Sequence, residues 1–120
     1  MMRIEPNVCS RRIDFLSDGY RLKGILHLPP AERPPVVIGS HGLLSSSESA
    51  KQRELAAQCT AAGMGYFRLD HRGCGRSQGY FPEVTTLKGR VQDVMAAVKI
   101  IRSRTDTGRA FAIGLDQHNR

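Results

Sequence analysis

The sequence lacks the features that mark secreted, membrane-spanning and metal-binding proteins. Its 120 residues hold only three cysteines, Cys9, Cys59 and Cys74, an odd number without Cys-x-x-Cys spacing. This pattern predicts reduced thiols rather than a disulfide framework or a zinc site. No apolar run reaches the ~20 residues that span a bilayer, and residues 1–12 contain no apolar signal-peptide segment. We therefore expect a cytoplasmic protein with no membrane partner, no metal and no organic cofactor.

Aromatic and acidic residues are also scarce. Aromatic residues make up 6% of the chain, and 11 acidic residues stand against 18 basic ones, which gives a net charge of +7. A basic balance indicates nucleic-acid binding when the charges cluster on one surface. Here they are spread along the whole chain, and no basic run is longer than Arg11-Arg12. Aromatic residues do not interleave with them as base stacking requires, so we expect a solvated basic surface and no nucleic-acid partner.

What the sequence does contain is an alternation of strand and helix patterns, which predicts an α/β fold with a mostly parallel sheet. Strands are expected, in chain order, at residues 12–16, 20–28, 35–40, 66–69 and 110–113. The first two flank Asp18-Gly19, a sequence typical of a tight antiparallel hairpin. Val36-Val37-Ile38 is continuously apolar, as in a strand that is buried on both faces.

Two helices are expected between these strands. The first begins near Ser45, because Glu48 three residues later fits a capping box, and it stops at Gly63. The second covers residues 86–104, where apolar residues recur at steps of three and four. The expected apolar stripes are Leu55, Ala56, Cys59 and Ala62 on the first helix, and Leu87, Val91, Val94, Val98 and Ile101 on the second.

A glycine-rich loop, Asp70-His71-Arg72-Gly73-Cys74-Gly75-Arg76-Ser77, follows the fourth strand. We expect its glycines to form tight turns and Asp70 or Ser77 to hydrogen-bond local backbone groups. For Arg72 and Arg76, solvation is favoured over pairing with carboxylates or contact with substrate. For His71, an ordinary loop histidine is favoured over a ligand or base. The glycine spacing is G-x-G-x-x-x-G, and Pro82 intervenes before the next helix, so the loop is not a dinucleotide-binding fingerprint.

Two motifs together resemble the α/β-hydrolase fold over about residues 12–118. His41-Gly42 comes directly after the third strand, and the glycine-rich loop comes directly after the fourth, about thirty residues later. The similarity is closest to the serine-hydrolase branch, with its esterase, lipase-like and aminopeptidase-like members. The resemblance implies hydrolysis of an ester or amide bond in a small acyl substrate. It divides the chain into a tail (1–11), a partial hydrolase domain (12–113) and a polar tail (114–120).

The resemblance gives the loop His41-Gly42-Leu43 a catalytic role. Acyl transfer passes through a tetrahedral oxyanion, which backbone N–H groups stabilise, and Gly42 permits a sharp turn after the strand. The implied donor of the oxyanion hole is the Leu43 N–H, with His41 and Gly42 shaping the loop. Without the second motif, a turn that merely ends the strand would be the better interpretation.

The segment after the fifth strand is where this family places a G-x-S-x-G nucleophile turn. Here it reads Gly114-Leu115-Asp116-Gln117-His118, with Asp116 at the serine position. Two interpretations are open: Asp116 is itself a carboxylate nucleophile, or the chain is a truncated or frame-disrupted product that is inactive as given. The polar residues 114–120 and the absence of a late general-base histidine favour the second.

A non-catalytic function is the remaining alternative. If no strand follows residues 110–113, Phe111 and Ile113 lie on an unprotected edge strand, which favours self-association. The same edge would suit an interaction module that recruits a partner by β-augmentation. The sequence names neither the substrate nor the oligomeric state.

Overall fold

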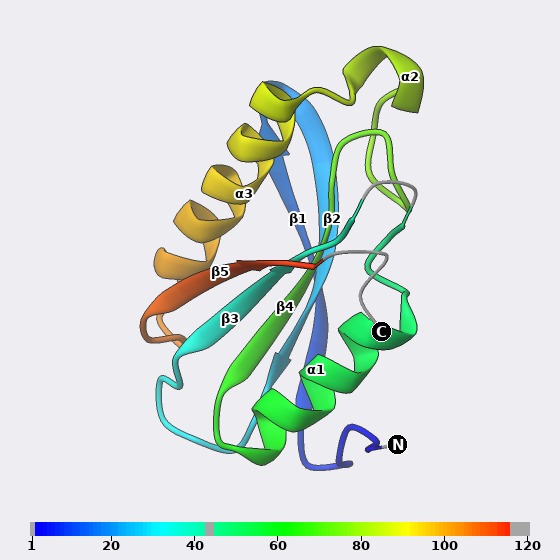
Figure 1. Cartoon of the computed structure of the whole chain (residues 1–120). Helices are drawn as coiled ribbons and strands as arrows, with labels where there is room; N and C mark the ends of the chain where they lie inside the picture. The colour runs from blue at the N-terminus through cyan, green and yellow to red at the C-terminus, as the bar shows by residue number, and fades with distance from the viewer. Residues whose placement is uncertain (1, 43–44, 116–120) are drawn as a thin grey trace.

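The computed structural model describes residues 2–42 and 45–115, with Pro82 described in its backbone alone, and shows a mixed sheet with helices on both faces (Figure 1). The elements, in chain order, are β1 (Cys9–Ser17), β2 (Tyr20–Leu28), β3 (Val36–Ser40), α1 (Ala50–Ala61), β4 (Gly65–Asp70), α2 (Phe81–Val84), α3 (Leu87–Arg102) and β5 (Ala110–Gly114). The predicted α/β fold class is confirmed. The short helix α2 was not expected from the sequence.

The five strands lie in the order β1-β2-β4-β3-β5. β1 pairs with β2 and β2 with β4 in antiparallel fashion, whereas β3 is parallel to both β4 and β5. Asp18 (φ 50°) and Gly19 (φ 82°) form the hairpin turn with positive φ at both positions, as the Asp-Gly sequence predicts. β1 begins at Cys9, opposite Leu28, three residues before its expected start at Arg12.

The strands divide their side chains between two cores, because successive residues of a strand point to opposite faces. On β3, Val36 and Ile38 belong to the larger core beneath α3, while Val37 packs in the smaller core beneath α1. On β4, Phe67 joins the larger core and Tyr66 the smaller one. Helices α1 and α3 therefore cover opposite faces of the sheet, as Figure 1 shows.

Helix α1 starts later than the sequence predicted. Its N-cap is Ser49, whose side chain accepts a hydrogen bond from the Gln52 backbone N–H, and not Ser45. The reason lies outside the helix: Ser47 donates from both its backbone N–H and its hydroxyl to Asp70, so this stretch is held by the β4 end. The predicted stop at Gly63, with φ of 85°, is confirmed.

Helix α3 uses only part of the stripe that its apolar periodicity predicted: Ile101 lies in the larger core, and Val94 and Val98 pack against it. The buried residues lie at steps of four: Gly89, Asp93, Ala97 and Ile101. Of the predicted stripe, Leu87 is 81% exposed and Val91 49% exposed. Small residues let the helix approach the sheet closely, and the polar contacts of Asp93 fix its rotation. No helix in the described ranges is long and apolar enough to cross a membrane.

Candidate active site

The carboxyl ends of β3, β4 and β5 meet at one edge of the sheet, where loops of an α/β fold carry function. The carbonyl oxygen of Ser40, the last residue of β3, accepts a hydrogen bond from the Leu115 N–H at 2.8 Å. The loop His41–Gly42 therefore begins beside the end of β5. β4 ends next to them at Asp70, which opens the glycine-rich loop.

His41 is buried and holds this loop in place. Its Nε2 accepts the backbone N–H of His71 at 3.1 Å, and Nδ1 lies 2.8 Å from the Gly42 carbonyl oxygen. Because Nε2 accepts, the proton is on Nδ1, which donates to Gly42. Burial lowers the pKa of His41 to about 4, so the ring is neutral at pH 7. The Arg90 guanidinium donates to the His41 carbonyl oxygen and fixes the loop from the α3 side.

Asp70 organises the glycine-rich loop as the sequence predicted. One carboxylate oxygen accepts the Ser47 N–H at 2.7 Å, and the other accepts the Ser47 hydroxyl at 3.0 Å. Its carbonyl oxygen accepts the Ser77 hydroxyl at 2.6 Å. A Cβ on Gly75, whose φ is 52°, would lie 2.4 Å from an Asp70 carboxylate oxygen. Only glycine lets this loop close over the carboxylate.

Arg72 is not a solvated surface residue, contrary to the sequence-based expectation. Its backbone N–H and its Nε both donate to the carboxylate of Asp93, at 2.8 and 3.0 Å, and a terminal guanidinium nitrogen pairs with Asp18 at 3.0 Å. It is 7% exposed. Burial acts to raise the pKa of Asp93, but hydrogen bonds from His71, Arg72 and Ser17 lower it to about 2.

His71 is likewise more than a loop histidine. It is fully buried, its Nε2 lies 2.6 Å from the Ser40 hydroxyl, and its Nδ1 lies 3.4 Å from Asp93. Neither Ser40 nor Asp93 was predicted from the sequence as a site residue. The sequence held one signal for Asp93. It lies four residues from both Gly89 and Ala97, and a helix places residues at this spacing on one face.

Of the predicted site residues, the structure places His41 and Gly42 at the end of β3, beside the end of β5. Leu43 and Asp116 lie outside the described residues. Within the described part of the chain, no group of three or more histidine, cysteine, aspartate or glutamate side chains could hold a metal ion.

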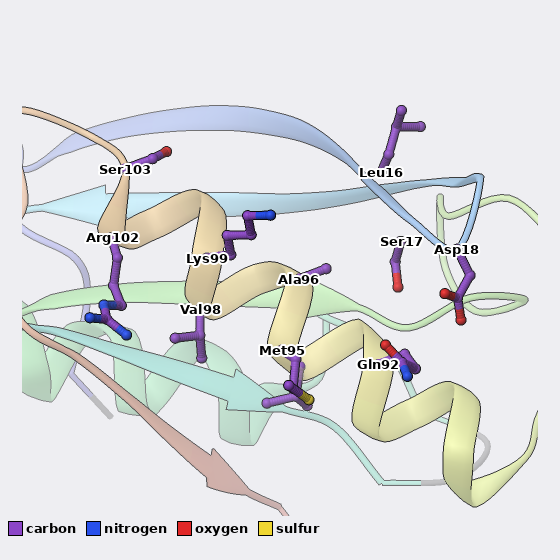
Figure 2. Close-up of a pocket in the computed structure, with 11 residues that line it drawn as sticks. Leu16, Ser17, Asp18, Gln92, Met95, Ala96, Val98, Lys99, Arg102 and Ser103 are labelled. Atoms are coloured by element: carbon purple, nitrogen blue, oxygen red, sulfur yellow. The ribbon is translucent and has the colours of Figure 1, made fainter.

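Two hollows lie along α3. A groove of about 800 Å³ runs between the helix and the end of β1. Its lining includes Gln92 and Lys99 of α3 and, from the β1–β2 hairpin, Leu16 and Asp18 (Figure 2). A smaller hollow of about 320 Å³ is lined by Ser40, Leu87, Arg90, Val91, Val94 and Met95. The smaller one reaches the end of β3 through Ser40, and so it borders the loop His41–Gly42.

Comparison with known proteins identifies a family. Residues 31–115 match the family model described as serine aminopeptidase, S33. No curated protein matches the chain. Many solved structures do, among them Est1E from Butyrivibrio proteoclasticus, solved with ferulic acid bound, which is 25% identical with a TM-score of 0.81; the match covers 88% of this chain and 43% of Est1E.

Two further solved structures show the same fold. The α/β hydrolase GrgF from Penicillium sp. sh18 is 23% identical with a TM-score of 0.80, and the match covers 89% of this chain and 37% of GrgF. The Pyrococcus furiosus esterase Pf2001 is 21% identical with a TM-score of 0.75, and the match covers 89% of this chain and 42% of the esterase. The chain thus spans less than half the length of each of these three proteins.

Proposed function

Because the chain belongs to the serine aminopeptidase S33 family of α/β-hydrolases, we propose that it takes part in the hydrolysis of ester or amide bonds in a small acyl substrate. The observation that carries the proposal is the position of the loop His41–Gly42. The loop starts beside the end of β5, where the Leu115 N–H bonds to Ser40, and His71 and Arg90 hold it from two sides. A loop fixed in this way supplies a preorganised donor without reorganisation during the reaction.

The proposed roles follow from this position. The Leu43 N–H donates to the oxyanion, and the nucleophile stands on the turn that follows Gly114. Est1E, a relative that binds ferulic acid, supports an ester of a carboxylic acid as the substrate class. Cys9, Cys59 and Cys74 are free, which supports a reducing, cytoplasmic location.

We propose further that the described residues supply no histidine base for a nucleophile on the turn that follows Gly114. A nucleophile on the turn after β5 needs a histidine base within hydrogen-bond reach. The histidines that the structure describes, His27, His41 and His71, are all buried and already hydrogen-bonded. The purified chain and its Asp116→Ala variant are therefore expected to hydrolyse p-nitrophenyl acetate at the same rate. Hydrolysis that depends on Asp116 would make this carboxylate the nucleophile instead.

A chimera tests the contribution of this chain to the activity. Residues 9–114 replace the aligned segment of Est1E, and the remainder of Est1E is kept. If β1 to β5 and their loops form a working half of an acyl hydrolase, the folded chimera hydrolyses p-nitrophenyl acetate. A chimera that folds, as judged by circular dichroism and a cooperative melting transition, and yet has no esterase activity would refute the proposal.

A second candidate function is supported by β5. In the described part of the chain this strand pairs with β3 alone, and Phe111 and Ile113 are 50% and 37% exposed. Such an edge favours strand pairing with a second copy or a partner. Size-exclusion chromatography is then expected to show concentration-dependent oligomers that Phe111→Lys reduces. A monomer at all concentrations would rule out self-association.

A further inference from the structure

Ser40, the last residue of β3, belongs to a hydrogen-bonded series of three side chains that the proposed function does not use. Ser40 Oγ lies 2.6 Å from His71 Nε2, and His71 Nδ1 lies 3.4 Å from Asp93 Oδ2. Three elements contribute: β3, the loop after β4 and helix α3. The imidazole therefore stands between a hydroxyl and a carboxylate, which is the arrangement that activates a serine in nucleophilic catalysis.

The protonation states favour the same chemistry. Hydrogen bonds keep the pKa of Asp93 at about 2, so its carboxylate is ionised and accepts a hydrogen bond from the protonated Nδ1 of His71. Nε2 then presents a lone pair to Ser40, whose hydroxyl donates to it. Burial lowers the pKa of His71, so the ring is an unprotonated base at neutral pH. Arg72 holds Asp93 through two hydrogen bonds and so fixes the carboxylate.

Ser40 is also within reach of a ligand. It lines the hollow of about 320 Å³, whose apolar wall includes Leu87 and Met95, and these two side chains are 81% and 61% exposed. Arg90 lines the same hollow, and its guanidinium donates to the His41 carbonyl oxygen. A positive charge at the wall of the hollow can stabilise an acyl oxygen that gains negative charge.

We propose that Ser40, His71 and Asp93 form an acyl-accepting site, in which Ser40 takes an acyl group from an activated ester with a short apolar chain. Ser40 Oγ bonds to the carbonyl carbon, and its proton passes to His71 Nε2. The bond to the leaving oxygen then breaks, and the proton on Nε2 passes to that oxygen, which departs as an alcohol. The site goes beyond the proposed function because it involves neither Leu43 nor Asp116.

Diisopropyl fluorophosphate tests the site directly. Attack by an activated serine forms a phosphorus–oxygen bond to Oγ and expels fluoride, and the serine proton leaves through His71 to the solvent. The folded 120-residue chain is expected to gain one diisopropylphosphoryl group, which peptide mapping by mass spectrometry places on Ser40. Ser40→Ala is expected to abolish this label, whereas Ser103→Ala, which removes an exposed hydroxyl on the same side of the sheet, keeps it.

The dependence on the fold separates an activated serine from a merely accessible one. His71→Gln removes the base and is expected to slow labelling of Ser40 at least about 100-fold. The wild-type chain in denaturing guanidinium chloride is expected to show no label, and this comparison holds even if His71→Gln fails to fold. No label on Ser40 in the folded protein, or an equal rate in the unfolded chain, would overturn the proposal. Either result leaves the role of Leu43 intact, since the Est1E chimera tests that separately.

Discussion

Asp93 on helix α3 accepts hydrogen bonds from both the backbone N–H and the side-chain Nε of Arg72, at 2.8 and 3.0 Å. One buried carboxylate therefore fixes the main chain and the side chain of the loop that follows β4. The Ser17 hydroxyl adds a further donor at 2.7 Å, which ties the β1–β2 hairpin to the same point. This one carboxylate contacts the loop and the hairpin from helix α3.

Replacing Asp93 is therefore expected to be costly. Asp93→Asn removes the buried negative charge and leaves the Arg72 guanidinium without its buried counter-ion, and loss of one partner of a buried pair costs about 3–5 kcal/mol. Urea unfolding monitored by circular dichroism gives the change in the free energy of unfolding.

Asp18→Asn is the matched control for this variant. Asp18 pairs with the same guanidinium, but its side chain is 50% exposed, so its removal is expected to cost less than about 1 kcal/mol. Equal losses in the two variants would show that the buried carboxylate has no special role.

Because His27 and His41 are buried and neutral, the protein is expected to have a lower free energy of unfolding in mild acid than at neutral pH. Burial lowers the pKa of both His27 and His41 to about 4, against about 6.5 in an unfolded chain. Between these values the unfolded state binds protons that the native state does not, so the free energy of unfolding falls as the pH falls. Each histidine contributes up to about 3 kcal/mol to this loss, which is complete near pH 4.

Urea midpoints at pH 7.5 and pH 4.5 measure this effect. His27 is protonated only at the expense of the hydrogen bond that its Nε2 accepts from Arg68 at 3.0 Å. His27→Gln removes that titration and is expected to flatten the pH dependence. A midpoint that is the same at both pH values would be inconsistent with buried neutral histidines.

Gly39 is expected to tolerate no side chain. A Cβ at this position would lie 2.0 Å from Tyr66 Oη and 2.3 Å from Gln52 Oε1, and both of these side chains are fully buried. Gly39→Ala is therefore expected to lower the free energy of unfolding by at least about 1–3 kcal/mol. Gly114→Ala is the control, because a Cβ there meets nothing within 4 Å among the described residues. If Gly39→Ala and Gly114→Ala have the same free energy of unfolding, Gly39 does not pack closely against Tyr66 and Gln52.

The strands and the hairpin could be predicted because their signals are local. Alternation of apolar residues and the Asp18-Gly19 turn depend only on neighbours in the sequence. The start of α1 could not be predicted in this way. Ser47 donates its hydrogen bonds to Asp70, which lies more than twenty residues downstream. Local capping patterns carry no information about such a distant acceptor.

The interior of the site was predicted less well for a related reason. The sequence motifs predicted the loops around His41 and Asp70, but they favoured a solvated Arg72 and an ordinary loop histidine at position 71. Their partner, Asp93, lies on a helix more than twenty residues away, and a charged side chain in an amphipathic pattern is ordinarily solvated. Only the packing of α3 on the sheet reveals that this carboxylate is buried.

The central claim, that the loop after β3 supplies an oxyanion donor, is tested most directly in the Est1E chimera. Leu43→Pro removes the backbone N–H, whereas Leu43→Ala keeps it and changes only the side chain. We expect kcat for p-nitrophenyl acetate to fall about 10²–10³-fold in Leu43→Pro and to change little in Leu43→Ala. Equal rates in the two folded variants would contradict the account, since the N–H would then have no part in the reaction.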